Sequence, residues 1–181
     1  MGEYKGTPIV FLRRLAAEHG VLDDMLHLLS DDEQHVFQEV LATTWVPLDF
    51  ADRIWRAAAK SLHPDECEAA ACRTLGDLLV RDNLTGVYSV FGRHLEPNKV
   101  LSNYVRTWAT YSRVGTPAVH KDDDGGIEFV LHDWPSSPVH VQNAIAGWLD
   151  GLVALCSVPC APFGMEPIAD GCRFFSRQKG C

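Results

Sequence analysis

The spacing of apolar residues changes near residue 115 from the period of a helix to the period of a strand. Before this point apolar side chains recur three and four residues apart, as in Phe50, Ile54 and Ala58. After it, apolar residues alternate with polar ones in two segments, 116–120 and 126–132. Helices followed by strands in this order predict an α+β fold.

The part before residue 115 predicts five helices, each beginning at a residue that suits a helix start. A glycine within the fourth helix, Gly76, lies on its apolar side and predicts a close crossing by another element. The expected starts are Thr7-Pro8, Ser30 with the acids after it, Leu48, the segment from His63 to Glu66, and Pro97.

The part after residue 115 predicts a hairpin, a long helix and a second hairpin. The first hairpin turns at residues 121–125, which we interpret as a solvated acidic tip rather than a calcium loop. The helix runs from about Val139 to Cys156, and two short strands follow at 158–163 and 171–177. We therefore expect an N-terminal helical bundle packed on a small four-stranded antiparallel sheet, with one long helix between two hairpins.

Repeats, low-complexity runs and linkers are absent, so residues 1–181 are expected to form a single ligand-binding-type domain. Its helical part covers about 1–115, and its sheet with the long helix covers about 116–181. A formal net charge of -8 with scattered basic residues disfavours nucleic acid as a partner. Without a signal peptide or an apolar stretch long enough for a membrane span, we expect a cytoplasmic protein whose six cysteines are mostly thiols.

Three short motifs in this order resemble a known superfamily. They are Lys5-Gly6-Thr7 before a short helix that ends at Gly20, the segment Ala146–Gly151, and the last strand 171–174. The chain resembles uncharacterised bacterial members of the superfamily that groups haem nitric-oxide/oxygen-binding (H-NOX) domains, vinyl-4-reductase domains and transport-protein-particle subunits of Golgi traffic. The resemblance implies a signalling or trafficking role, frequent dimers, and a cavity between helices and sheet for haem, a lipid chain or another hydrophobic ligand.

The sequence departs from the haem-binding branch of this superfamily. That branch carries a Tyr-x-Ser-x-Arg signature for the haem propionates, whereas the nearest string here, Tyr111-Ser112-Arg113, has a different spacing. His94 is the histidine nearest the expected axial position, but it precedes Pro97 in a polar loop. Haem is therefore not expected as a cofactor.

Aromatic residues on the apolar faces of the helices are the candidate ligand-binding residues. Tryptophan and tyrosine can line a hydrophobic cavity while offering a hydrogen-bonding edge. The alternative is that these rings only fill the core, which stripes at helical spacing do more often. The candidates are Trp108, Tyr104, Trp55 and Trp148.

Three C-terminal cysteines are the candidate metal ligands. If the second hairpin turns near Glu166-Pro167, Cys160 lies opposite Cys172, with Cys156 close by. Three thiolates at that point would suit zinc, with Cys181 or His140 as a fourth ligand. Two alternatives stay open: a redox-labile pair of Cys160 and Cys172, or plain packing, because the paired spacing of confident zinc sites is absent.

No catalytic motif for hydrolysis, metalloprotease chemistry or phosphate binding appears in the sequence. We therefore expect a non-enzymatic domain that binds a small hydrophobic ligand and acts as a sensor through a homodimer or a partner surface. The alternative is a structural adaptor whose interior is filled by its own side chains. A third possibility is a thiol-dependent or metal-dependent activity at the C-terminal cysteines.

Overall fold

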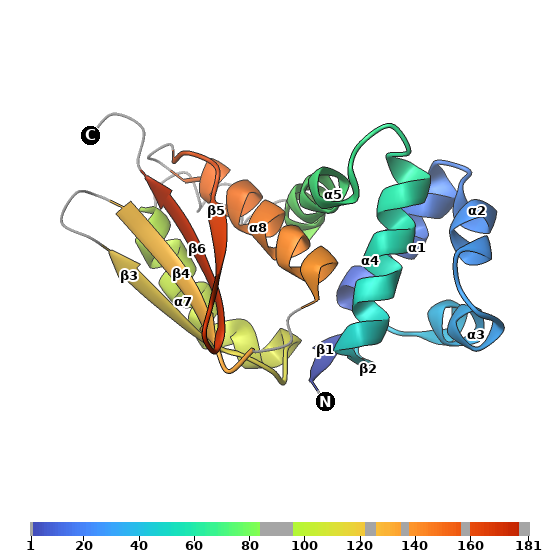
Figure 1. Cartoon of the computed structure of the whole chain (residues 1–181), viewed down its shortest axis with the longest axis horizontal. Helices are drawn as coiled ribbons and strands as arrows, with labels where there is room; N and C mark the ends of the chain where they lie inside the picture. Colours follow the sequence, from blue (N-terminus) through green and yellow to red (C-terminus); the bar gives the residue numbers. More distant parts are fainter. Residues whose placement is uncertain (1, 84–95, 122–125, 135–137, 157–159, 178–181) are drawn as a thin grey trace.

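A computed structural model describes residues 2–83, 96–121, 126–134, 138–156 and 160–177. Helices α1 to α4 form one end of the molecule, the four-stranded sheet forms the other, and α5 and α8 lie between them (Figure 1). The helices are α1 (Thr7–Glu18), α2 (Leu22–His27), α3 (Asp31–Glu39), α4 (Leu48–Leu62), α5 (Glu68–Asn83), α7 (Pro97–Tyr111) and α8 (Val139–Ala154). The strands are β1 (Glu3–Lys5), β2 (Trp45–Pro47), β3 (Thr116–Lys121), β4 (Gly126–His132), β5 (Gly164–Ile168) and β6 (Gly171–Arg177).

The larger sheet is antiparallel, with strand order β3-β4-β6-β5. The predicted α+β fold, with one long helix between two hairpins, is confirmed. Alternation along β4 buries Ile127, Phe129 and Leu131 on one face of the sheet, and Phe174 of β6 pairs with Phe129 across the ladder. This apolar face is the floor on which the helices pack.

Helices α5 and α8 cross in close contact, and the crossing depends on glycines. Gly76 of α5 lies against the backbone carbonyl of Ala144, where a Cβ atom would overlap the oxygen. Gly147 of α8 lies equally close to the carbonyl of Arg73. The close crossing that the sequence predicted at Gly76 is confirmed, and two facing glycines are what allow it.

At the helical end, Ser30 caps α3 as predicted. Its hydroxyl accepts the backbone N–H of Glu33, whose carboxylate accepts the N–H of Ser30 in return.

Helix α2 and the short β1-β2 ribbon were not predicted from the sequence. In that ribbon Trp45 is flanked by the cations of Lys5 and Arg113, 4.2 and 4.1 Å from its ring centroid.

Two expected boundaries are wrong. Helix α5 begins at Glu68 and not at 63–66, since a turn at Pro64–Glu66 separates it from α4. Strand β5 begins at Gly164, whereas a strand was expected at 158–163, of which 158–159 lie outside the described residues. Among the helices of the described ranges, none is both long enough and apolar enough to cross a membrane.

Candidate functional site

Aromatic rings from three elements gather above the inner face of the sheet. Tyr104 of α7 stacks on Trp148 of α8 with ring centroids 4.0 Å apart, and it meets Trp108 edge-on at 5.7 Å. Phe129 of β4 lies 5.9 Å from Tyr104, and Trp134 lies 5.7 Å from Trp108. We call these five residues the aromatic cluster, and at these separations every ring contacts at least one other.

The cluster has a buried back and a half-buried front. Trp108, Phe129 and Trp134 are buried, whereas Tyr104 and Trp148 are half-buried. Burial raises the pKa of the Tyr104 phenol well above its ordinary value, so the hydroxyl stays neutral at physiological pH. The front of the cluster is therefore an uncharged aromatic wall.

Three of the four predicted ligand-binding residues, Tyr104, Trp108 and Trp148, come together in this cluster. The fourth, Trp55, is buried on α4, and its backbone carbonyl lies 3.7 Å from the Cys72 thiol. It makes no ring contact with the cluster in the part of the chain that the structure describes. Helical periodicity placed all four on apolar faces, but it could not say which faces meet.

The described residues around the cluster do not fit a haem group. Tyr104 and Trp148 are already in direct stacking contact, so no porphyrin-sized gap separates them. His132 and His140, on the neighbouring elements, are hydrogen-bonded to carboxylates. Arg113, which a propionate would attract, is bonded to Glu3 at 2.7 Å. The candidate axial ligand that the sequence suggested, His94, lies outside the described residues.

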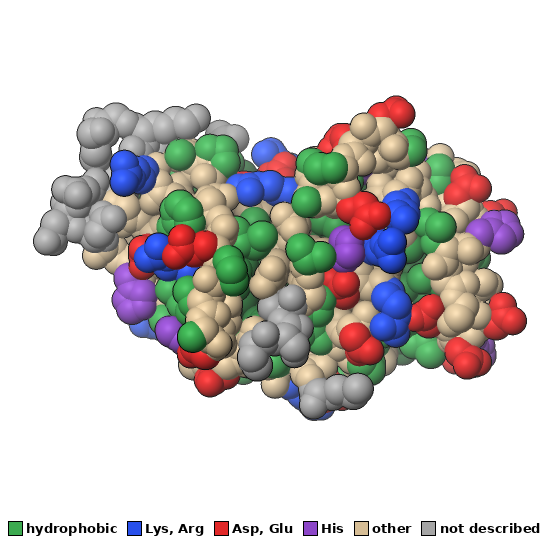
Figure 2. Space-filling model, in the orientation of Figure 1, with side chains coloured by type: hydrophobic (Ala, Val, Ile, Leu, Met, Phe, Trp, Pro, Cys, Tyr) green, Lys and Arg blue, Asp and Glu red, His purple; other side chains and the backbone are tan. Residues whose placement is uncertain are grey.

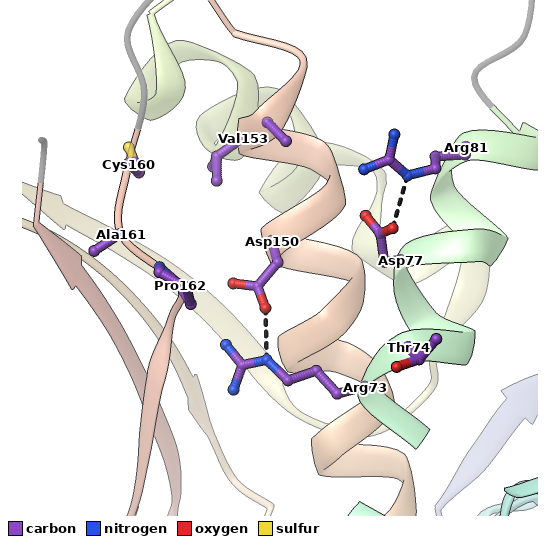
Figure 3. Close-up of a pocket in the computed structure, with 10 residues that line it drawn as sticks. Arg73, Thr74, Asp77, Arg81, Asp150, Val153, Cys160, Ala161 and Pro162 are labelled. Carbon is purple, nitrogen blue, oxygen red and sulfur yellow. Dashed lines mark hydrogen bonds and ion pairs between the residues drawn. The ribbon is translucent and has the colours of Figure 1, made fainter. Parts of the chain in front are cut away.

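A second feature is a cleft of about 460 Å³ between α5, α8 and the segment before β5 (Figure 3). Arg73 of α5 donates to the Asp150 carboxylate at 2.6 Å and to the carbonyl of Phe163 at 2.5 Å. Asp150 also accepts the backbone N–H of Phe163 at 2.7 Å. Both polar backbone groups of a buried residue are thus held by one ion pair, which fastens the start of β5 to the two helices.

We expect Asp150→Asn to lower the free energy of unfolding by about 2 kcal/mol, because it removes the charge that pairs with Arg73 and turns one acceptor into a donor. Urea unfolding measures this loss. Asp77→Asn is the matched control, since Asp77 pairs with the more exposed Arg81 at 2.7 Å, and it should cost less than about 1 kcal/mol. Equal losses in the two variants would contradict a special role for the Phe163 contacts.

The predicted meeting of the three C-terminal cysteines is wrong. The second hairpin turns at Ala169–Asp170, so Cys172 lies opposite Pro167 and not opposite Cys160. Cys160 lies near the other end of β6, where Ala161 donates to the carbonyl of Arg177. Among the described residues no group of three histidine, cysteine or acidic side chains is placed to hold a metal ion.

Sequence reasoning missed a third feature, a contact between His140 of α8, Asp52 of α4 and Glu68 of α5. Both nitrogens of the His140 ring lie within 3 Å of carboxylate oxygens. The two acids stand 88 and 72 residues from the histidine in the chain. No local motif signals a contact over such distances, so only the folded chain reveals it.

Several solved structures of H-NOX proteins share this fold. A mutant H-NOX protein from K. algicida in the unliganded Fe(II) state matches with a TM-score of 0.70 and 11% identity, over 97% of this chain and 96% of that one. An H-NOX protein from S. oneidensis in the Fe(II)NO state matches with a TM-score of 0.66 and 14% identity, over 97% of this chain and 99% of that one. An oxygen-binding H-NOX domain related to soluble guanylate cyclases matches with a TM-score of 0.61 and 14% identity, over 97% of this chain and 93% of that one.

No protein-family model matches the sequence, and no curated protein matches it. The chain therefore has the fold of H-NOX domains over nearly its whole length, as its resemblance to that superfamily predicted. At this level of identity the similarity concerns the course of the backbone. The chemistry of the site has to be read from the side chains of this chain.

Proposed function

We propose that residues 1–181 form one non-enzymatic sensory domain that binds a small, planar, hydrophobic molecule at the front of the aromatic cluster. The ligand would stack on Tyr104 and Trp148, with Trp108 behind them. The conformational change caused by ligand binding would alter the surface that contacts a second copy of the chain or a partner protein. We also propose a cytoplasmic location, in keeping with the expected thiols.

One observation carries this proposal: the stacked pair is half-buried, while the rings behind it are buried. A ligand can therefore reach Tyr104 and Trp148 without unfolding the core. The pair also joins two layers of the fold, because α7 packs on β3 while α8 packs on α5. A ligand that separates or tilts these rings would favour a different spacing of the two layers, which is how binding can shift a conformational equilibrium.

The alternative function, a structural adaptor with a filled interior, has an observation in its favour. The rings of Tyr104 and Trp148 already stack on each other at a centroid distance of 4.0 Å, and a stack of this kind stabilises the core without any ligand. Native mass spectrometry of the protein purified from cells separates the two functions. A co-purifying mass that dissociates on activation supports the sensor, whereas a bare chain or bare dimer supports the adaptor.

A binding experiment locates the site. We expect the anionic aromatic probe 1-anilinonaphthalene-8-sulfonate, whose naphthalene ring is planar and apolar, to bind the folded protein saturably and to quench tryptophan fluorescence. Trp148→Ala should weaken this binding roughly tenfold or more, because loss of one stacked aromatic contact costs about 1.4 kcal/mol. Tyr104→Ala should have a similar effect.

Trp45→Ala is the matched control, because Trp45 is a half-buried tryptophan in the β1-β2 ribbon, outside the cluster. It should leave probe affinity unchanged. Near-UV circular dichroism confirms that each variant keeps its tertiary packing. Equal probe affinity in the Trp148, Tyr104 and Trp45 variants would overturn the proposed site.

A further inference from the structure

The N-terminal end of α8 is fastened to two other helices through one imidazole ring. The Nδ1 atom of His140 lies 2.9 Å from a carboxylate oxygen of Asp52 on α4, and its Nε2 atom lies 2.8 Å from a carboxylate oxygen of Glu68 on α5. The His140 side chain is only 13% exposed. Figure 2 shows side chains of both charges gathered over α4 and the neighbouring end of α8.

This geometry determines the charge of the ring. A neutral imidazole has one N–H donor and one lone pair, whereas an ionised carboxylate can only accept. With a carboxylate oxygen at each nitrogen, a neutral ring would turn its lone pair toward a negative oxygen. Only the protonated ring, with two donors, satisfies both contacts.

Both carboxylates have further donors close by. The second oxygen of Asp52 accepts the backbone N–H groups of His140 and Val141 at 2.9 and 3.2 Å. Glu68 also pairs with Arg56 and Lys60 of α4 at 3.3 and 3.2 Å. The hydrogen bond from His140, followed by the contacts of Lys60 and Arg56, lowers the pKa of Glu68 to about 2 against the opposing effect of desolvation.

The charged and titratable groups around this contact come from two helices. From α4 these groups are Asp52, Arg56 and Lys60, and from α5 they are Glu68 and the thiol of Cys72. Burial and then the two carboxylates raise the pKa of Cys72 to about 12, so this thiol stays neutral. Histidine is the side-chain type that changes charge between about pH 5 and 8.

We propose that protonated His140 is a pH-sensitive clamp that fastens α8 to α4 and α5 and releases Glu68 when the proton leaves. The clamp acts at the first turn of α8, and Trp148 lies farther along the same helix. Proton concentration thereby biases the position of the helix that carries half of the stacked pair. The clamp rests on its own three residues, and it stands whether or not the aromatic cluster binds a ligand.

The sign of the pH dependence follows from the two partners. Loss of the His140 proton at high pH makes its contact with Glu68 repulsive, so stability is lost. As the pH falls from the usual value of 4.5 toward 2, Glu68 takes up a proton in the folded state and its share of the clamp is lost. The clamp is therefore weakened at low pH through Glu68 and at high pH through His140.

Thermal unfolding of the full chain from pH 5 to 9 tests the clamp. We expect the wild-type midpoint to exceed that of His140→Gln by roughly 6 °C at pH 6 and by roughly 2 °C at pH 8.5, since each lost charge-assisted contact shifts the midpoint by a few degrees at this chain length. His35→Gln is the control, because His35 is 72% exposed beside Glu39 on α3. It should retain the wild-type profile, and a His140→Gln difference that is independent of pH would overturn the proposal.

Two further measurements hold even if His140→Gln fails to fold. In Glu68→Gln an amide can either accept from or donate to the ring, so the variant should fold and its pH profile should be flatter than that of the wild type. Nitrogen-15 NMR of labelled histidine should show two protonated ring nitrogens for His140 at pH 6.5. A neutral ring at that pH, or a Glu68→Gln profile equal to the wild-type profile, would show that the clamp is absent.

Discussion

Gly147→Ala is expected to lower the free energy of unfolding by about 4 kcal/mol, a loss at the upper end for single substitutions. A methyl group at this position overlaps the carbonyl oxygen of Arg73 in α5, and a backbone atom cannot turn aside as a flexible side chain can. The two helices must therefore move apart along a crossing that also includes Gly76. Overpacking of this kind costs about 1–3 kcal/mol when side chains can relax, and more when they cannot.

Separation of α5 and α8 also loosens the ion pair of Arg73 with Asp150, so the start of β5 loses its anchor. Chemical denaturation followed by circular dichroism measures the loss of stability. Gly20→Ala is the control, because Gly20 has a φ of +72° but no atom within 4 Å of an added Cβ. It should cost about 1 kcal/mol through backbone strain alone. A Gly147→Ala cost no larger than that would contradict the close crossing.

Trp108→Ala should be similarly severe, with a loss of about 4 kcal/mol, as is typical when a buried aromatic side chain is truncated. Trp108 is 2% exposed and contacts Tyr104, Phe129 and Trp134 in the aromatic cluster. Removal of its ring leaves a cavity between α7 and the sheet. Urea unfolding gives the size of the loss.

The variant Trp108→Phe distinguishes the contribution of the ring to stability from that of its N–H group. The indole nitrogen donates to the carbonyls of Val114 and Gly115 at 3.1 and 3.0 Å, which ties α7 to the start of β3. Phenylalanine keeps most of the ring contacts but leaves these carbonyls without that donor, so we expect an intermediate loss of about 2 kcal/mol. Equal stability of Trp108→Phe and the wild type would indicate that the N–H group contributes nothing.

Similarity to known structures shows the fold of this chain but not the chemistry of its site. An identity of 11–14% accompanies the same arrangement of helices and strands as in H-NOX structures. Backbone arrangement depends on the pattern of apolar residues, which many sequences share. A binding site depends on particular side chains, and in this chain Tyr104 stacks directly on Trp148.

Local patterns in the sequence were enough to predict α4 over 48–62, the start of α7 at Pro97, and β4 and β6 with their bounds. Each of these elements has a clear apolar period and a residue that starts or ends it, so its conformation depends on near neighbours. The cap at Ser30 was predicted for the same reason, whereas Gly76 indicated a close crossing without its partner. Element α2 was missed because its six residues are too few to show a period.

Register and long-range contacts were decided only by the tertiary structure. A shift of the second hairpin's turn from 166–167 to 169–170 separates Cys160 from Cys172, and no local preference in the sequence determines that choice. The meeting of His140 with Asp52 and Glu68, and of Tyr104 with Trp148, likewise depends on how three helices and a sheet pack. Periodicity determines which face of an element is buried, but the partner of that face depends on the packing of the whole chain.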